Sequence, residues 1–211
     1  MFGISITLLS IPVAAYLLGS IPFGLVLARL FGGTDVRKQG SGNIGATNVA
    51  RVVGPLAGIL TLVLDAAKGA VAVLIAERLS NDSATWMMIA AFAALLGHCY
   101  SIWLNFKGGK GVATAAGVFL VLSPLAFLGS IILFLLVAIF WRYISLASLS
   151  AAAAMPLLIY LLWAPHHAPP PVITFGTLAV ALLIVYKHDA NIQRLLQGEE
   201  PKFSLSKKKD H

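Results

Sequence analysis

Three short segments of this chain combine glycine with polar and basic side chains, a combination that binds oxyanions. The clearest is "FKGGKGVAT" (residues 106–114), where Lys107 and Lys110 stand among three glycines between two apolar stretches. Glycines let successive backbone N–H groups converge on an anion, and a lysine adds positive charge. The nucleotide P-loop requires glycine at the position of Leu104 and Ser or Thr at the position of Gly111, so ATP binding loses support.

The second segment, "GSGNIGATNVAR" (residues 40–51), alternates glycines with hydroxyl and amide side chains and ends on an arginine. A helix would set Thr47, Asn48 and Arg51 beside one another. The hydroxyl, amide and guanidinium groups of these residues are hydrogen-bond donors, and Arg51 adds a fixed positive charge. We therefore expect the segment to contact an anion as well.

The third segment, "KHDANIQRLLQGEE" (residues 187–200), places Lys187, Asn191 and Arg194 at the spacing of one helical face, with His188 flanking it. Each segment alone would fit a solvated loop or an orientation signal. The three together predict a divided oxyanion or phosphate site.

Metal and thiol chemistry find little support in the sequence. The chain has one cysteine, Cys99, which excludes an internal disulfide and a cysteine metal cluster, and nothing in the sequence activates it as a nucleophile. The acidic residues of the polar segments do not form a paired-carboxylate or two-metal pattern. We expect neither a metal nor a cofactor.

The elements that position these segments are membrane helices. Of the 211 residues, 59% are hydrophobic and 11% charged, whereas an ordinary soluble domain is about one quarter charged. Apolar runs fall at roughly 4–28, 55–76, 84–104, 112–140, 143–163 and 172–186, and a bilayer core needs about 20 helical residues. We expect one polytopic membrane domain over residues 1–199 and a basic, disordered tail over 200–211 beside anionic lipid.

The run 112–140 decides how many spans there are, because a helix of that length would reach about 43 Å. Ser123 and Pro124 supply a break. Two spans there give an all-α bundle of seven transmembrane helices, although 112–123 is short and a re-entrant element is the alternative. All but Lys68 and Arg78 of the 15 lysines and arginines then share one side.

The positive-inside rule places that side in the cytoplasm, with the N-terminus outside and the C-terminus cytoplasmic. The net charge of +7 is thereby interpreted as a topology signal and not as a nucleic-acid surface. Asp65 and Lys68 stand three residues apart within one span, where charges are costly unless matched. They form either a neutralising ion pair or part of the substrate site.

At "GSGNIGATN", "FKGGKGVATA" and "KHDANIQRLLQGEE" the chain resembles the bacterial acyl-phosphate-dependent glycerol-3-phosphate acyltransferases, the PlsY family. "LLGSIPFG", "LDAAKG" and "LGHCYSIW" also resemble family segments, so the resemblance covers about residues 10–200. It implies transfer of a fatty acyl group from acyl phosphate to the sn-1 hydroxyl of glycerol 3-phosphate, giving lysophosphatidic acid and phosphate at the bacterial cytoplasmic membrane. The His-x-x-x-x-Asp motif of other glycerolipid acyltransferases is absent, with Trp103 and Gln193 at the aspartate positions.

The resemblance assigns binding or catalysis to Ser41, Asn43, Asn48, Arg51, Lys110, His188 and Asn191. Loop composition adds Thr47, Gly108, Gly109, Gly111 and Thr114 as substrate-binding residues. We expect Arg51, Lys110 and His188 to take part in catalysis.

Acyl phosphate is already activated, so we expect direct attack by the glycerol hydroxyl without an acyl-enzyme. The proton goes either to His188 or, as we prefer, to a substrate phosphate. A soluble enzyme that makes acyl phosphate is a possible transient partner on the basic face. The alternatives are a small transporter of an anionic metabolite and a non-catalytic scaffold, of which the scaffold leaves the polar segments unexplained.

Overall fold

The computed structural model describes residues 6–163 and 170–203, and within these ranges every regular element is helical. The α-helices are α1 (Ile6–Ser20), α2 (Phe23–Gly32), α3 (Ala46–Val52), α4 (Pro55–Ser80), α5 (Ala84–Cys99), α6 (Val112–Leu122), α7 (Pro124–Trp141), α8 (Ile144–Trp163), α9 (Pro171–Lys187) and α10 (Asp189–Leu196). Two short 3-10 helices, η1 (Val36–Lys38) and η2 (Ile102–Leu104), lie in the loops. The all-helical prediction is thus confirmed for the described residues.

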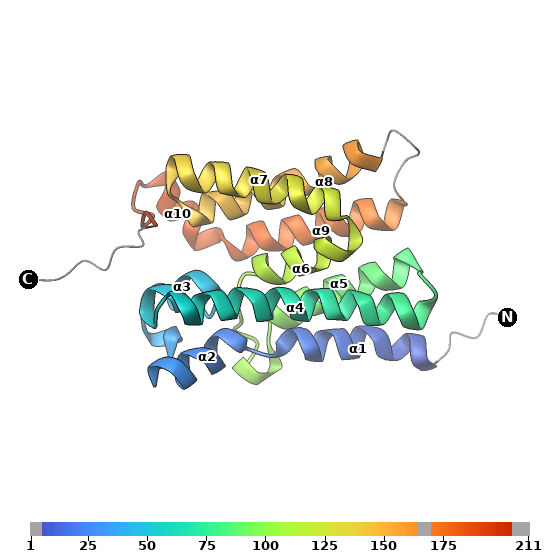
Figure 1. The fold of residues 1–211 in the computed structure, drawn as a ribbon, viewed down its shortest axis with the longest axis horizontal. Coiled ribbons are helices and arrows are strands. Elements are labelled where there is room, and N and C mark those ends of the chain that lie inside the picture. The colour runs from blue at the N-terminus through green and yellow to red at the C-terminus, as the bar shows by residue number, and fades with distance from the viewer. Residues whose placement is uncertain (1–5, 164–169, 204–211) are drawn as a thin grey trace, which may run out of the picture.

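The long helices run side by side in two groups (Figure 1). In the first, α4 packs against α1, α2, α3, α5 and α6; in the second, α8 packs against α7, α9 and α10. Contacts of α5 with α9 and of α6 with α7 join the groups. The short helices α3 and α10 lie at the same end of the bundle, opposite the end where α1 begins.

Five helical segments are long and apolar enough to cross a membrane, or six if the bent α9–α10 pair is counted as one span. The predicted break is confirmed, since α6 ends at Leu122 and α7 begins at Pro124. With 11 residues, α6 rises only about 16 Å, roughly half of a bilayer core. Seven crossings and the orientation of the termini therefore stay predictions.

The first apolar run is not one helix, because it divides at Ile21 and Pro22 into α1 and α2. Proline lacks the N–H of a continuing helix and disfavours helical conformation in the residue before it. At the break, the Ile21 carbonyl oxygen accepts hydrogen bonds from the Phe23 backbone N–H at 3.1 Å and from Lys68 Nζ on α4 at 2.8 Å.

Glycines let α4 and α6 pack backbone against backbone. A Cβ atom at Gly69 would clash with the Thr114 carbonyl oxygen, and one at Gly117 would clash with the Ala66 carbonyl oxygen. Such close contact fixes the height of α6 along α4. It thereby fixes the position at which α6 begins. The start of α6 lies at the pocket between the two helix groups.

Candidate active site

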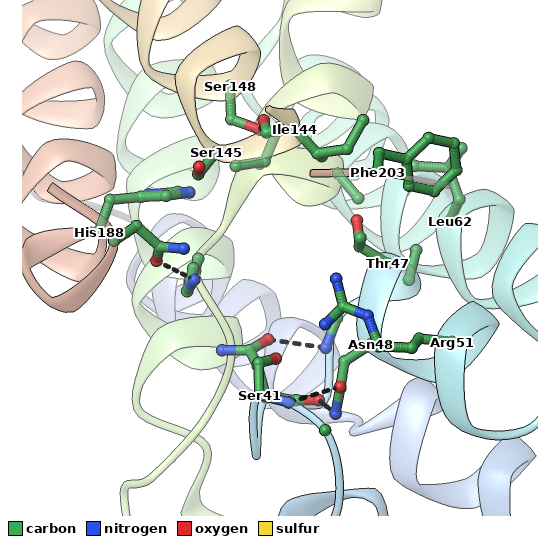
Figure 2. A pocket seen from close by; sticks show the side chains of 18 of the residues that line it. Ser41, Thr47, Asn48, Arg51, Leu62, Ile144, Ser145, Ser148, His188 and Phe203 are labelled. Atoms are coloured by element: carbon green, nitrogen blue, oxygen red, sulfur yellow. Dashed lines mark hydrogen bonds between the residues drawn. The ribbon is translucent and has the colours of Figure 1, made fainter. Parts of the chain in front are cut away.

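A pocket of about 570 Å³ lies between the two helix groups. It is lined from all three polar segments, which are distant in sequence. Figure 2 shows Thr47 and Arg51 on one side of it and Ser145, Ser148 and His188 on the other. Of the sequence-predicted residues, the pocket brings together Ser41, Asn43, Thr47, Asn48, Arg51, Lys110, Gly111, His188 and Asn191.

Three predicted binding residues do not line this pocket: Gly108, Gly109 and Thr114. Gly108 and Gly109 donate backbone hydrogen bonds to the carbonyl oxygens of Cys99 (3.1 Å) and His98 (2.9 Å). A Cβ atom at either glycine would clash with α5. These glycines therefore hold the loop against α5, while Thr114 is buried against α4.

Asn48 organises the loop that precedes α3. Its side chain is buried, and its Nδ2 donates to the carbonyl oxygens of Val36 (3.1 Å), Gln39 (3.1 Å) and Asn43 (2.8 Å). Its Oδ1 accepts a hydrogen bond from the Ser41 backbone N–H at 2.9 Å. All polar atoms of the amide are thus engaged within the protein, and Asn48 shapes the wall on which Ser41 and Asn43 sit.

Lys110 connects the two helix groups. Its ammonium donates to Asn191 Oδ1 on α10, and Asn191 Nδ2 donates to Glu200 Oε1 at 2.6 Å. Glu200 also accepts from Arg194 Nε at 2.7 Å. Sequence reasoning did not select Glu200 as a site residue, and it named Arg194 only as a member of the helical face predicted for the third segment.

The same contacts describe the start of the predicted tail. Glu200 sits in the pocket, and the Phe203 backbone N–H donates to the Arg142 carbonyl oxygen at 2.7 Å. Burial alone would raise the pKa of Glu200, but the side chains of Ser145, Asn191 and Arg194 bring it below its usual value. Residues 204–211 lie outside the described residues, and disorder there stays a prediction.

The pKa of the Lys110 ammonium lies closer to neutral pH than that of an ordinary lysine. Burial lowers the pKa of its ammonium to about 8; Glu200 raises it, and the cations of Arg194 and Arg51 lower it further. At pH 7 the group is still largely protonated, because its pKa lies about one unit higher. An anion bound beside it would raise the pKa and secure the charge.

His188 is held as a neutral hydrogen-bond acceptor. Its Nδ1 lies 2.7 Å from the Ile184 carbonyl oxygen, which can only accept, so Nδ1 carries the hydrogen and Nε2 has a free lone pair. Burial is the main cause that lowers the pKa of the imidazole to about 4, and nearby Lys110 contributes. His188 therefore accepts a hydrogen bond readily and holds a proton poorly at pH 7.

Helix α6 begins in the pocket. Gly111, Val112 and Ala113 line it, and the helix has no side-chain cap on its first N–H groups. Gly111 adopts φ of 85°, a left-handed conformation that glycine tolerates best. Uncapped N–H groups and the positive end of the helix dipole favour an anion at this position.

The third segment is not one continuous helix, and the predicted common face of Lys187, Asn191 and Arg194 is wrong. α9 and α10 meet at His188 with a bend of 61°. The bend turns Lys187 away, so that its Nζ lies 4.6 Å from the Tyr100 ring centroid. It also points His188 into the pocket (Figure 2), and Asn191 lines the same pocket.

An apolar pocket of about 60 Å³ adjoins the polar one between α6, α7, α8 and α9. The two share Val112, Phe134 and Ser148 as lining residues. The shared wall places apolar side chains next to the cationic groups of the first pocket. Among the described residues no group of three or more His, Cys, Asp or Glu could hold a metal ion.

Comparison with known proteins gives one consistent family. A family model described as glycerol-3-phosphate acyltransferase matches residues 9–198. The glycerol-3-phosphate acyltransferase of Syntrophotalea carbinolica is 53% identical over 190 residues, covering 90% of this chain and 94% of that protein. That of Trichlorobacter lovleyi is 52% identical over 191 residues, with coverages of 90% and 94%.

Solved structures agree. The chain superimposes on the crystal structure of PlsY (YgiH), an integral membrane glycerol 3-phosphate acyltransferase in its glycerol 3-phosphate form, with a TM-score of 0.86 and 41% identity. The match covers 93% of this chain and 96% of that one. The lysophosphatidic acid form of PlsY gives a TM-score of 0.83 at 40% identity, with coverages of 94% and 96%.

The position of Lys110 between Glu200 and two arginines makes its titration a test of the site. We expect NMR of the ¹³C-methylated protein to show a Lys110 resonance that titrates with a pKa of about 8 and is missing from Lys110→Arg. Glu200→Gln removes the charge that raises this pKa, so the midpoint should move lower. A midpoint at the usual lysine value, or one indifferent to Glu200→Gln, would contradict the described geometry.

Proposed function

Because the chain belongs to the glycerol-3-phosphate acyltransferase family, we propose that its pocket transfers a fatty acyl group from acyl phosphate to the sn-1 hydroxyl of glycerol 3-phosphate. The products are lysophosphatidic acid and phosphate. One observation carries the proposal: Lys110, Arg51 and the uncapped start of α6 converge on one pocket. Both substrates carry a phosphate, and the two cations together with the N–H groups of α6 can bind two anions side by side.

The reaction is a direct displacement. The glycerol hydroxyl oxygen attacks the acyl carbonyl carbon, a new C–O ester bond forms, and the bond from that carbon to the phosphate oxygen breaks with phosphate as leaving group. Lys110 and the N–H groups at the start of α6 stabilise the charge on the donor phosphate and the developing oxyanion. Arg51, opposite them, binds the phosphate of glycerol 3-phosphate.

The hydroxyl proton passes to a substrate phosphate, whose second pKa is about 6. His188 orients the substrate by accepting a hydrogen bond at Nε2 from the sn-2 hydroxyl of glycerol 3-phosphate, since its own pKa of about 4 suits it poorly as the base. No acyl-enzyme is needed, and Cys99 is buried under Gly111 outside the pocket lining.

The first methylene groups of the donor's acyl chain enter the apolar pocket of about 60 Å³ between α6 and α9, and the rest of the chain extends into the membrane. The enzyme acts at the bacterial cytoplasmic membrane with α3 and α10 toward the cytoplasm, where a soluble acyl-phosphate-producing enzyme makes transient contact. The alternative of a metabolite transporter loses support, because the relatives compared above are acyltransferases.

The assay uses purified protein in lipid vesicles with acyl phosphate and labelled glycerol 3-phosphate, followed for lysophosphatidic acid, with acyl-CoA as a parallel donor. Lys110→Ala removes a cation from the reacting phosphate and should lower kcat/KM by about 100-fold or more. Lys107→Ala is the matched control from the same loop, exposed and outside the pocket, and should keep full activity. Absence of product from the unaltered protein, or equal losses in the two variants, would contradict the proposal.

A second prediction concerns the acyl chain. Ala152 lines the apolar pocket, so Ala152→Leu should lower kcat/KM for long-chain acyl phosphates by about tenfold, with a smaller loss for short chains. Ala153 is exposed on the same helix and does not line the pocket, which makes Ala153→Leu the control. Equal kinetics of the two variants across chain lengths would place the acyl chain elsewhere.

A further inference from the structure

A buried charged cluster lies beneath the loop that carries Lys110. Asp65 and Lys68 on α4 are 2% and 3% exposed, and Lys68 Nζ lies 2.8 Å from Asp65 Oδ1. The predicted ion pair is therefore present. Lys68 also binds the Ile21 carbonyl oxygen at the break between α1 and α2.

Neutralisation alone does not account for Asp65. The same Oδ1 atom lies 3.6 Å from Nδ1 of His98, which is buried and has no hydrogen-bond partner among the described residues. Asp65 also lines the pocket, where a carboxylate would repel a phosphate. A carboxylate beside an anion site can still contribute to the site if it orients a neighbouring side chain of the protein and does not contact the substrate.

His98 connects Asp65 to the Lys110 loop. A Cβ atom at Gly109 would clash with His98 Nε2, so the imidazole ring packs directly on that glycine. The His98 carbonyl oxygen accepts the Gly109 N–H at 2.9 Å. Lys110 is the next residue, and its ammonium faces the pocket.

We propose that Asp65 is a positioning residue: through His98 it sets the placement of Gly109 and Lys110 at the phosphate site, while Lys68 balances its charge. The carboxylate orients the Nδ1–H edge of the imidazole, and the opposite edge supports Gly109. A shift of the ring would carry the Lys110 ammonium away from the reacting phosphate. The inference rests on the proposed function, because turnover is its readout.

The test separates positioning from charge balance. Asp65→Asn alone would leave Lys68 buried and unpaired, so the informative variant is the charge-balanced Asp65→Asn/Lys68→Met. If Asp65 only neutralises Lys68, this variant keeps the kinetics of the unaltered protein. If Asp65 positions the loop, kcat/KM falls by about tenfold or more while the thermal midpoint stays close to that of the unaltered protein. Asp82→Asn/Arg78→Met is the matched control, because Arg78 is exposed in the last turn of α4 and Asp82 is exposed in the turn that follows it.

His98 variants keep the ion pair and test the link itself. His98→Asn retains a donor near the position of Nδ1, whereas His98→Leu retains none, so Asn should restore most of the turnover that Leu loses. Adding His98→Leu to the charge-balanced variant should lower kcat/KM little further, because both changes break the same connection between Asp65 and His98. Equal turnover of His98→Asn and His98→Leu, or unchanged kinetics of the charge-balanced variant, overturns the inference. Failure of the unaltered protein to form product would instead defeat the proposed function.

Discussion

The hydrogen bond from Lys110 to Asn191 joins the two helix groups across the pocket, and the rest of the site is arranged around it. Lys110 is carried by the loop between α5 and α6 of the first group, and Asn191 by α10 of the second. Glu200 fixes Asn191 from the far side and engages Arg194. A polar contact of this kind is worth most where the surroundings exclude water.

A second constraint follows from the apolar setting, which forces buried charges to find partners. Asp65 pairs with Lys68, and Glu200 pairs with Arg194. Of the described carboxylates, none lies within ion-pair distance of Arg51 or Lys110. Of the lysines and arginines that line the pocket, Arg194 is paired with Glu200, which leaves Arg51 and Lys110 without a carboxylate partner. This division of charges supports the proposal that the pocket binds two phosphates.

Much of this arrangement could be predicted from the sequence, because hydropathy marks the helices and glycine-rich basic segments are conspicuous between them. The break at Pro124 and the convergence of Arg51, Lys110 and His188 follow from such signals. The bend at His188 does not, since neither proline nor glycine interrupts the helical spacing there. α9 nevertheless ends at Lys187.

The roles of individual loop residues were harder to predict for a related reason. A glycine that makes room for a ligand and one that makes room for a neighbouring helix look alike in sequence, so Gly108 and Gly109 could not be distinguished from Gly111. Asn48 likewise carries the chemistry of a ligand-binding amide, yet its hydrogen bonds all go to its own loop. Only the three-dimensional contacts show which polar groups are already satisfied.

The central claim is that phosphate binds where α6 begins, between Lys110 and Arg51. A crystal structure of the protein with bound glycerol 3-phosphate and a non-hydrolysable acyl phosphonate tests it most directly. The account predicts both phosphorus atoms inside this pocket, with one oxygen within hydrogen-bond distance of Lys110 Nζ and another near the N–H groups of Gly111 to Ala113. Phosphorus density elsewhere, for instance beside the exposed Arg29 and Arg37, with the pocket empty, would contradict it.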